Sequence, residues 1–157
     1  MFDLHTHVLP GVDDGPETIE SAIKMANVAA NQGTNLIVAT PHRKDVTEHH
    51  SVPYIRNLLT KLTVRLETAG IKLKLLLGME NHLDLDLPKD LSAGRALSIN
   101  GSRYALVELP FHGYPVDTMD ILKQIQTKGI TPILAHPERI EAIQSNTHLL
   151  DDFVKTS

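Results

Sequence analysis

The sequence predicts an α/β protein built around a mainly parallel β-sheet. Short runs rich in β-branched and other apolar residues alternate with segments of helical periodicity, about five times in 157 residues. Glycine follows three of the helical segments, at positions 33, 70 and 129. Because repeated strand–helix units place their strands side by side and parallel, the chain is expected to form a sheet or barrel covered by helices.

The alternation defines each expected element. Strands are expected over residues 2–7, 35–42, 72–81, 103–110 and 131–139, and helices from Pro16 to Gly33, over 52–69, over 116–128 and from Ile140 onward. Pro16 suits the first helical position, and Ile19, Ile23 and Ala26 would form that helix's apolar face. Residues 82–102 are expected to be irregular, because Pro88 and Gly94 interrupt any long element.

The length of the chain bears on how the sheet closes. A closed (β/α) barrel usually needs about 250 residues, so five units would leave sheet edges that proteins normally protect. We therefore expect residues 1–157 to be a single domain whose barrel is incomplete at its C-terminal end. Pairing with another chain, including a homo-oligomer, is the alternative.

Composition excludes several classes of function. The chain has no cysteine, which rules out disulfides, thiolate zinc sites and a cysteine nucleophile. Its net charge is −4 and it has no basic run, which argues against nucleic-acid binding. We find neither a secretory signal pattern nor an apolar run of membrane-spanning length, so a cytoplasmic protein without membrane insertion is expected.

Imidazole and carboxylate side chains end the expected strands. Ordered along the chain, they are His5, His7, His42, Glu80, Glu108 and His136. They recur at intervals of about 30 to 40 residues, which is about one strand–helix unit. Since parallel strands joined by helices have their carboxyl ends at one edge, these side chains are expected to converge, with Asp14 reaching the same edge from a loop.

This donor set predicts a catalytic metal centre. Imidazoles and carboxylates without thiolates suit manganese, iron or zinc. Two or three ions are expected, with Glu80 able to bridge two of them. Asp3 lies on the same face of its strand as His5 and is expected to orient a ligating histidine.

Each motif also has a structural interpretation. A single His-x-His is common, and Asp13 to Pro16 could form only a turn and helix cap. The histidines outside the strand ends are expected to be structural or exposed: His49, His50, His82, His112 and His148. Of these, His112 follows Glu108 most closely and is the best candidate to line the site. The repetition at every strand end favours metal binding over these separate interpretations.

The motifs DLHTH, GVDDGP, IVATPH, GME, YALVELP and AHPER resemble the polymerase-and-histidinol-phosphatase (PHP) superfamily. Within it they are similar to the bacterial manganese-dependent protein-tyrosine phosphatases of capsule and exopolysaccharide gene clusters. The resemblance implies a distorted TIM-like (β/α)7 barrel with three metal ions, of which this chain supplies about the first five units. It implies the metal ligands His5, His7, Asp14, His42, Glu80, Glu108 and His136, and a phosphate contact from Arg139.

These expectations lead to a functional hypothesis. The favoured reaction is metal-assisted hydrolysis of a phosphomonoester, with Arg139 and Arg43 stabilising charge on the phosphate oxygens. The resemblance implies that the substrate is the phosphotyrosine tail of a polysaccharide-assembly tyrosine kinase. It also implies a later Asp-x-His ligand pair that these residues do not contain. The alternatives are a histidinol-phosphate-type phosphatase and a non-catalytic metal-binding or kinase-docking remnant.

Overall fold

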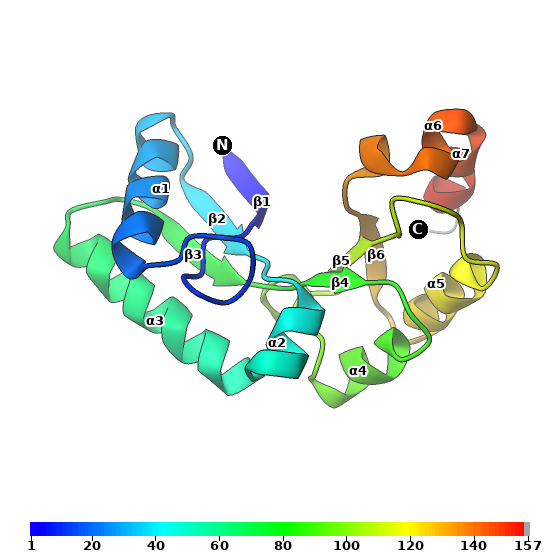
Figure 1. Ribbon diagram of the computed structural model, residues 1–157, viewed down its shortest axis with the longest axis horizontal. Helices are drawn as coiled ribbons and strands as arrows, with labels where there is room; N and C mark the ends of the chain where they lie inside the picture. Colours follow the sequence, from blue (N-terminus) through cyan, green and yellow to red (C-terminus); the bar gives the residue numbers. More distant parts are fainter. Residues whose placement is uncertain (156–157) are drawn as a thin grey trace. The chain divides into compact units, whose positions relative to one another are not determined.

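A computed structural model describes residues 1–155, which form two compact units (Figure 1). The first unit comprises Met1–Met79 and the second begins at Glu80. Each unit contains parallel strands joined by helices, as the alternating pattern predicts. The expected α/β class is therefore confirmed.

The first unit is a three-stranded parallel sheet, in the order β1-β2-β3, with α3 packed against β3 and with α1 and α2 packed against α3. Its elements are β1 (Phe2–Thr6), α1 (Ile19–Asn31), β2 (Leu36–Ala39), α2 (Arg43–His49), α3 (Val52–Thr68) and β3 (Lys74–Leu77). Helix α3 packs against α1 and β3 and buries Ile55, Leu62 and Leu66. These leucines and isoleucines lie on the apolar face that the 52–69 periodicity predicts.

Helix α1 begins later than its sequence pattern suggests. Its N-cap is Thr18, whose hydroxyl accepts a hydrogen bond from the Ser21 backbone N–H at 3.2 Å. Pro16 instead belongs to a loop, where its carbonyl oxygen accepts from the Gly11 N–H at 2.8 Å. The expected helix start at Pro16 is therefore wrong, because the Thr18 hydroxyl caps the first turn and the helix begins at Ile19, three residues after Pro16.

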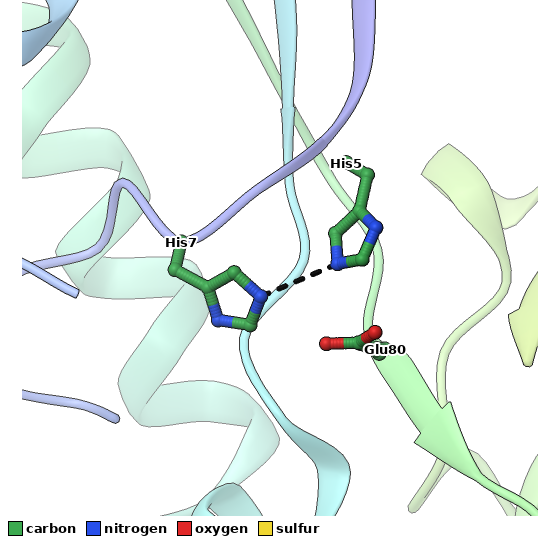
Figure 2. A group of neighbouring side chains, drawn as sticks. All are labelled: His5, His7 and Glu80. Atoms are coloured by element: carbon green, nitrogen blue, oxygen red, sulfur yellow. Dashed lines mark hydrogen bonds between the residues drawn. The ribbon is translucent and has the colours of Figure 1, made fainter. Parts of the chain in front are cut away.

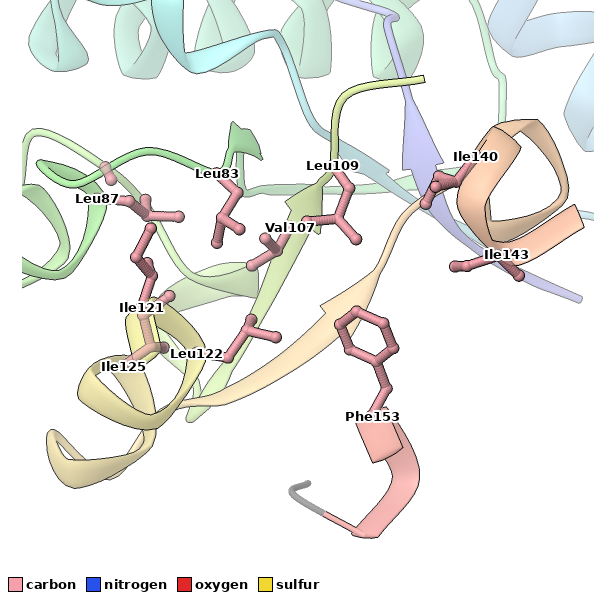
Figure 3. Close-up of a cluster of buried hydrophobic side chains, with 11 residues drawn as sticks. Leu83, Leu87, Val107, Leu109, Ile121, Leu122, Ile125, Ile140, Ile143 and Phe153 are labelled. Atoms are coloured by element: carbon pink, nitrogen blue, oxygen red, sulfur yellow. The ribbon is translucent and has the colours of Figure 1, made fainter. Parts of the chain in front are cut away.

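The second unit repeats this architecture with a parallel sheet in the order β4-β5-β6. Its elements are β4 (Glu80–His82), α4 (Leu87–Ala93), η1 (Ile99–Gly101), β5 (Tyr104–Glu108), α5 (Thr118–Thr127), β6 (Thr131–Leu134), η2 (Pro137–Arg139), α6 (Glu141–Ser145) and α7 (His148–Lys155). Its core joins α4, β5, α5, α6 and α7 (Figure 3). Ile125 of α5, Leu87 of α4 and Ile140 before α6 are each fully buried there.

Three details differ from the sequence-based expectations. The expected strand 72–81 is two strands, because β3 pairs with β2 only as far as Leu77, whereas β4 starts at Glu80 and pairs with β5. The expected irregular segment 82–102 contains α4, in which Pro88 occupies the first turn and Gly94 is the left-handed C-cap. Helix α2, directly after His42, was not expected.

Within residues 1–155 the strands form two open three-stranded sheets and no closed barrel. None of the helices in this part of the chain combines the length and the hydropathy that crossing a bilayer requires.

Candidate metal-binding residues

In the first unit, three candidate histidines lie at the carboxyl edge of the sheet. His5 is in β1 and His7 follows it, while His42 follows β2. Thr6 is in register with Ala39, so the residues after both strands emerge side by side. The rings of His7 and His42 are accordingly 4.6 Å apart between centroids. The convergence expected for parallel strands is thus present within this unit.

His5 and His7 direct nitrogen atoms at each other. Their Nε2 atoms are 3.3 Å apart (Figure 2). Two imidazole nitrogens on one ion, with bonds of about 2.1 Å at roughly right angles, would be about 3 Å apart. The spacing therefore fits two ligands of a shared divalent cation.

Asp13 fixes the tautomer that such binding needs. Its Oδ2 lies 2.7 Å from Nδ1 of His7 and accepts that proton, which leaves the Nε2 lone pair of His7 directed at His5. Asp13 also accepts hydrogen bonds from the backbone N–H groups of His42 and Gly15, at 3.0 and 3.1 Å. Its side chain is fully buried. The carboxylate therefore links the segments after β1 and β2 that carry the candidate ligands His7 and His42.

The pKa of Asp13 reflects these contacts. Burial by itself would raise this pKa, but the hydrogen bonds from His7, His42 and Gly15 and the attraction of His7 outweigh burial and lower the pKa below 3.8. The group is therefore a carboxylate, and hence only an acceptor, at any pH where histidine binds metal.

Asp14, unlike Asp13, is exposed and faces the histidines directly. Its Oδ1 is 3.3 Å from Nδ1 of His7 and 3.8 Å from Nε2 of His42. One donor atom from each of these three side chains lies within 4.8 Å of the others. His7, Asp14 and His42 thus form a second group that fits a cation.

Sequence reasoning assigned the orienting role to Asp3 instead of Asp13. Asp3 accepts a hydrogen bond from the backbone N–H of His5 at 3.1 Å, not from an imidazole ring. The expectation for Asp3 is wrong because a side chain within a strand bonds most readily to nearby backbone. The turn that the sequence analysis allowed for residues 13–16 is present, since Oδ1 of Asp13 accepts a hydrogen bond from the Gly15 N–H, while its Oδ2 holds His7.

Gly15 allows this loop to lie against β1. A Cβ at this position would collide with the His7 carbonyl oxygen and lie 3.2 Å from Oδ1 of Asp13. Gly15→Ala is therefore expected to displace Asp13 and to weaken manganese binding by about ten-fold or more, measured by calorimetric titration.

The control for Gly15 is Gly70→Ala. A Cβ at Gly70 meets nothing within 4 Å, but its φ of +70° strains any alanine. That variant should lose stability and keep its manganese affinity. Equal losses of affinity in both variants would show that the effect of Gly15→Ala is not local.

In the second unit, Glu80 and His136 lie together. Nε2 of His136 is 3.4 Å from Oε1 of Glu80, whose side chain is fully buried. The sequence analysis expected Glu80 to end a strand, but it is the first residue of β4. A buried carboxylate next to an imidazole fits a cation site, because a buried carboxylate needs positive charge close by.

Glu108, the last residue of β5, faces a histidine that the sequence analysis left as structural. Nδ1 of His82 is 3.7 Å from Oε2 of Glu108, and the two residues are in register across β4 and β5. The spacing of Glu80 and His82 repeats that of His5 and His7, and this was the signal for His82. His112, in contrast, is 93% exposed and lies 3.5 Å from Glu141.

The segment after β6 is strained at a candidate ligand. His136 has a φ of +45° directly before Pro137, a conformation that a non-glycine residue adopts only when its surroundings hold it there. Such strain gathers at functional sites. Arg139 follows in η2 and is exposed, whereas Arg43 is only 5% exposed. Of the two arginines, Arg139 is the more accessible to a ligand.

Comparisons with known proteins identify relatives of the chain. The chain is 35% identical to the tyrosine-protein phosphatase YwqE of Bacillus subtilis (strain 168), over 99% of this chain and 61% of YwqE. It is 34% identical to the putative tyrosine-protein phosphatase CapC of Staphylococcus aureus, over 98% of this chain and 60% of CapC. The chain thus spans about three fifths of the length of these curated relatives.

A solved structure from the same group of relatives matches the fold of this chain. It comes from work on YwqE from Bacillus subtilis and CpsB from Streptococcus pneumoniae, described as unique metal-dependent tyrosine phosphatases. It superposes with a TM-score of 0.95 at 34% identity, covering 100% of this chain and 64% of that one. The resemblance drawn from the motifs is confirmed. Residues 1–157 match the family described as capsular polysaccharide synthesis, CpsB/CapC, and the chain belongs to this family.

Proposed function

We propose that this chain is the metal-binding part of a protein-tyrosine phosphatase of capsule or exopolysaccharide synthesis. The observation that carries the proposal is the pair of His5 and His7 Nε2 atoms, 3.3 Å apart, with the His7 tautomer fixed by Asp13. The names of the relatives, which are tyrosine-protein phosphatases, support the reaction. The proposed substrate is the phosphotyrosine tail of a bacterial tyrosine kinase.

The proposed metal ligands come from both units. They are His5, His7, Asp14, His42, Glu80, Glu108 and His136. Manganese is the proposed metal. Imidazole and carboxylate donors suit it, and they also suit iron and zinc. When bound, divalent ions neutralise phosphate oxygens and acidify a water molecule near neutral pH.

The protein's own residues have distinct roles in this proposal. Asp13 holds His7 in the tautomer that presents Nε2, and Gly15 lets the Asp13 loop lie against the strand. Arg139 binds the phosphate through its N–H groups, while the buried Arg43 is the second, less accessible candidate. A phenolate leaves with a conjugate-acid pKa of about 10, so the reaction depends little on a dedicated general acid. Without cysteine, the chain cannot form a phosphocysteine intermediate.

The remaining expectations stay predictions. They are the seven-unit PHP barrel, a single domain over 1–157, a cytoplasmic location and a homo-oligomer.

The test is turnover of a phosphotyrosine peptide by the full chain, stripped with a chelator and then supplied with manganese. We expect release of phosphate only with the metal, and a preference for the peptide over histidinol phosphate. Elemental analysis of the same samples reports bound metal independently. Metal binding without hydrolysis of either substrate would support the non-catalytic alternative, and a preference for histidinol phosphate would support the small-molecule phosphatase.

A further inference from the structure

Phe111 lies next to a proposed metal ligand, His136, and the proposed phosphate contact, Arg139. Its ring is 6.4 Å from that of His136 in an edge-to-face arrangement, and Cζ of Arg139 lies 5.9 Å from its centroid. The Phe111 carbonyl oxygen accepts a hydrogen bond from the Glu141 N–H at 2.9 Å. The loop after β5 is therefore tied to the start of α6.

The Phe111 ring is also accessible. The residue is 36% exposed, although an aromatic side chain gains more by full burial. Its two polar neighbours, His136 and Arg139, both have roles in the proposed reaction. An accessible aromatic ring between a candidate metal ligand and a candidate phosphate contact is suited to hold an aromatic group attached to that phosphate.

We propose that Phe111 is the specificity-determining residue that selects aryl over alkyl phosphomonoesters, by packing against the aromatic ring of the substrate. This inference rests on the proposed phosphatase function and adds the residue that recognises the tyrosine side chain. It concerns the choice of substrate and leaves the metal ligands unchanged.

The geometry of an aryl phosphate fits this role. A guanidinium lying over an aromatic ring keeps its N–H groups available at its edge, where a phosphate can be bound in a forked manner. In an aryl phosphate, one oxygen separates the phosphorus from the ring. A phosphate held by Arg139 therefore brings its ring within the distances of about 4.5 to 7 Å at which aromatic pairs attract each other.

A purely structural role for Phe111 predicts a different result. If the ring only braces Arg139 and His136, its loss would weaken the binding of every phosphate ligand to the same extent. A contact with the substrate ring would instead weaken only the binding of aromatic ligands. The ratio of the affinities for an aromatic and a non-aromatic phosphate ligand therefore distinguishes these two roles.

The experiment compares benzylphosphonate with cyclohexylmethylphosphonate, which resist hydrolysis and match each other in size. Their dissociation constants are measured by calorimetry on the manganese-loaded full chain. The native chain should prefer the benzyl compound by about two- to ten-fold, and Phe111→Leu should reduce this ratio to about one. Phe111→Tyr keeps a ring and should keep the preference. Tyr104→Leu is the matched control, because Arg103 lies over Tyr104 at 5.1 Å at the opposite end of β5.

Each other result overturns the inference. If the ratio of the two dissociation constants is unchanged in Phe111→Leu, whether or not both affinities fall, Phe111 does not contact the ligand ring. In either case phosphotyrosine turnover by the native chain would still support the proposed function. If the native chain neither binds the phosphonates nor hydrolyses the phosphotyrosine peptide, the proposed function fails and this inference fails with it.

Discussion

Replacing His7 by alanine is expected to remove a metal ion from the first unit and to lower phosphotyrosine turnover by on the order of a hundred-fold or more. His7 is the residue shared by both candidate groups of this unit, because it faces His5 through Nε2 and lies close to Asp14 and His42. Its loss therefore disrupts both groups. Bound manganese, measured by elemental analysis after dialysis, should fall together with turnover.

The matched control for His7→Ala is His148→Ala. His148 is 89% exposed and lies 3.4 Å from Asp151 in α7. This variant should keep the metal content and turnover of the native chain, and circular dichroism should show that both variants are folded. Native manganese content in His7→Ala would contradict the assignment of His7 as a ligand.

Asp13→Ala is expected to weaken manganese binding by about 10- to 100-fold, although Asp13 is not itself a proposed ligand. The carboxylate accepts hydrogen bonds from the His7 ring and from the backbone of His42 and Gly15. Without it, the His7 ring loses both its orientation and its fixed tautomer. Asp13→Asn should be intermediate, because one of the two acceptor oxygens becomes an amide nitrogen that cannot accept. Calorimetric titration with manganese measures all three affinities.

Asp120→Asn provides the comparison for this series. Asp120 is 76% exposed and lies 4.0 Å from Lys123 on α5. Its substitution should leave manganese affinity within about two-fold of native, as is usual for an exposed ion pair. If Asp13→Ala and Asp13→Asn bind manganese as well as the native chain, Asp13 serves only the turn with Gly15.

Much of the fold could be predicted because hydrophobic periodicity follows burial. The 52–69 pattern located α3, since its apolar face packs on the sheet, and the pattern over 116–128 located α5 for the same reason. The division of 72–81 into β3 and β4 could not be predicted. No turn-forming pair other than a single Gly78 marks their boundary in the sequence, and that boundary depends on which strand each one pairs with, a property of the assembled sheets.

The candidate site was predictable to a similar degree. The sequence placed His7 and His42 after neighbouring strands, and register in the parallel sheet brings their rings together. The sequence did not show that Asp13, and not Asp3, orients His7. That choice depends on a loop whose path requires the absence of a side chain at Gly15. The contact of His82 with Glu108 was not predicted, because it depends on the register of β4 against β5.

The α/β class, the family and the chemical type of the candidate donors follow from the amino-acid sequence, because burial periodicity and residue type are local properties of the chain. The carboxylate that fixes the His7 tautomer, the position of Glu80 in its strand and the contacts of Phe111 with His136 and Arg139 depend on how the chain folds. These are distances between segments far apart in sequence, and packing and strand register set them.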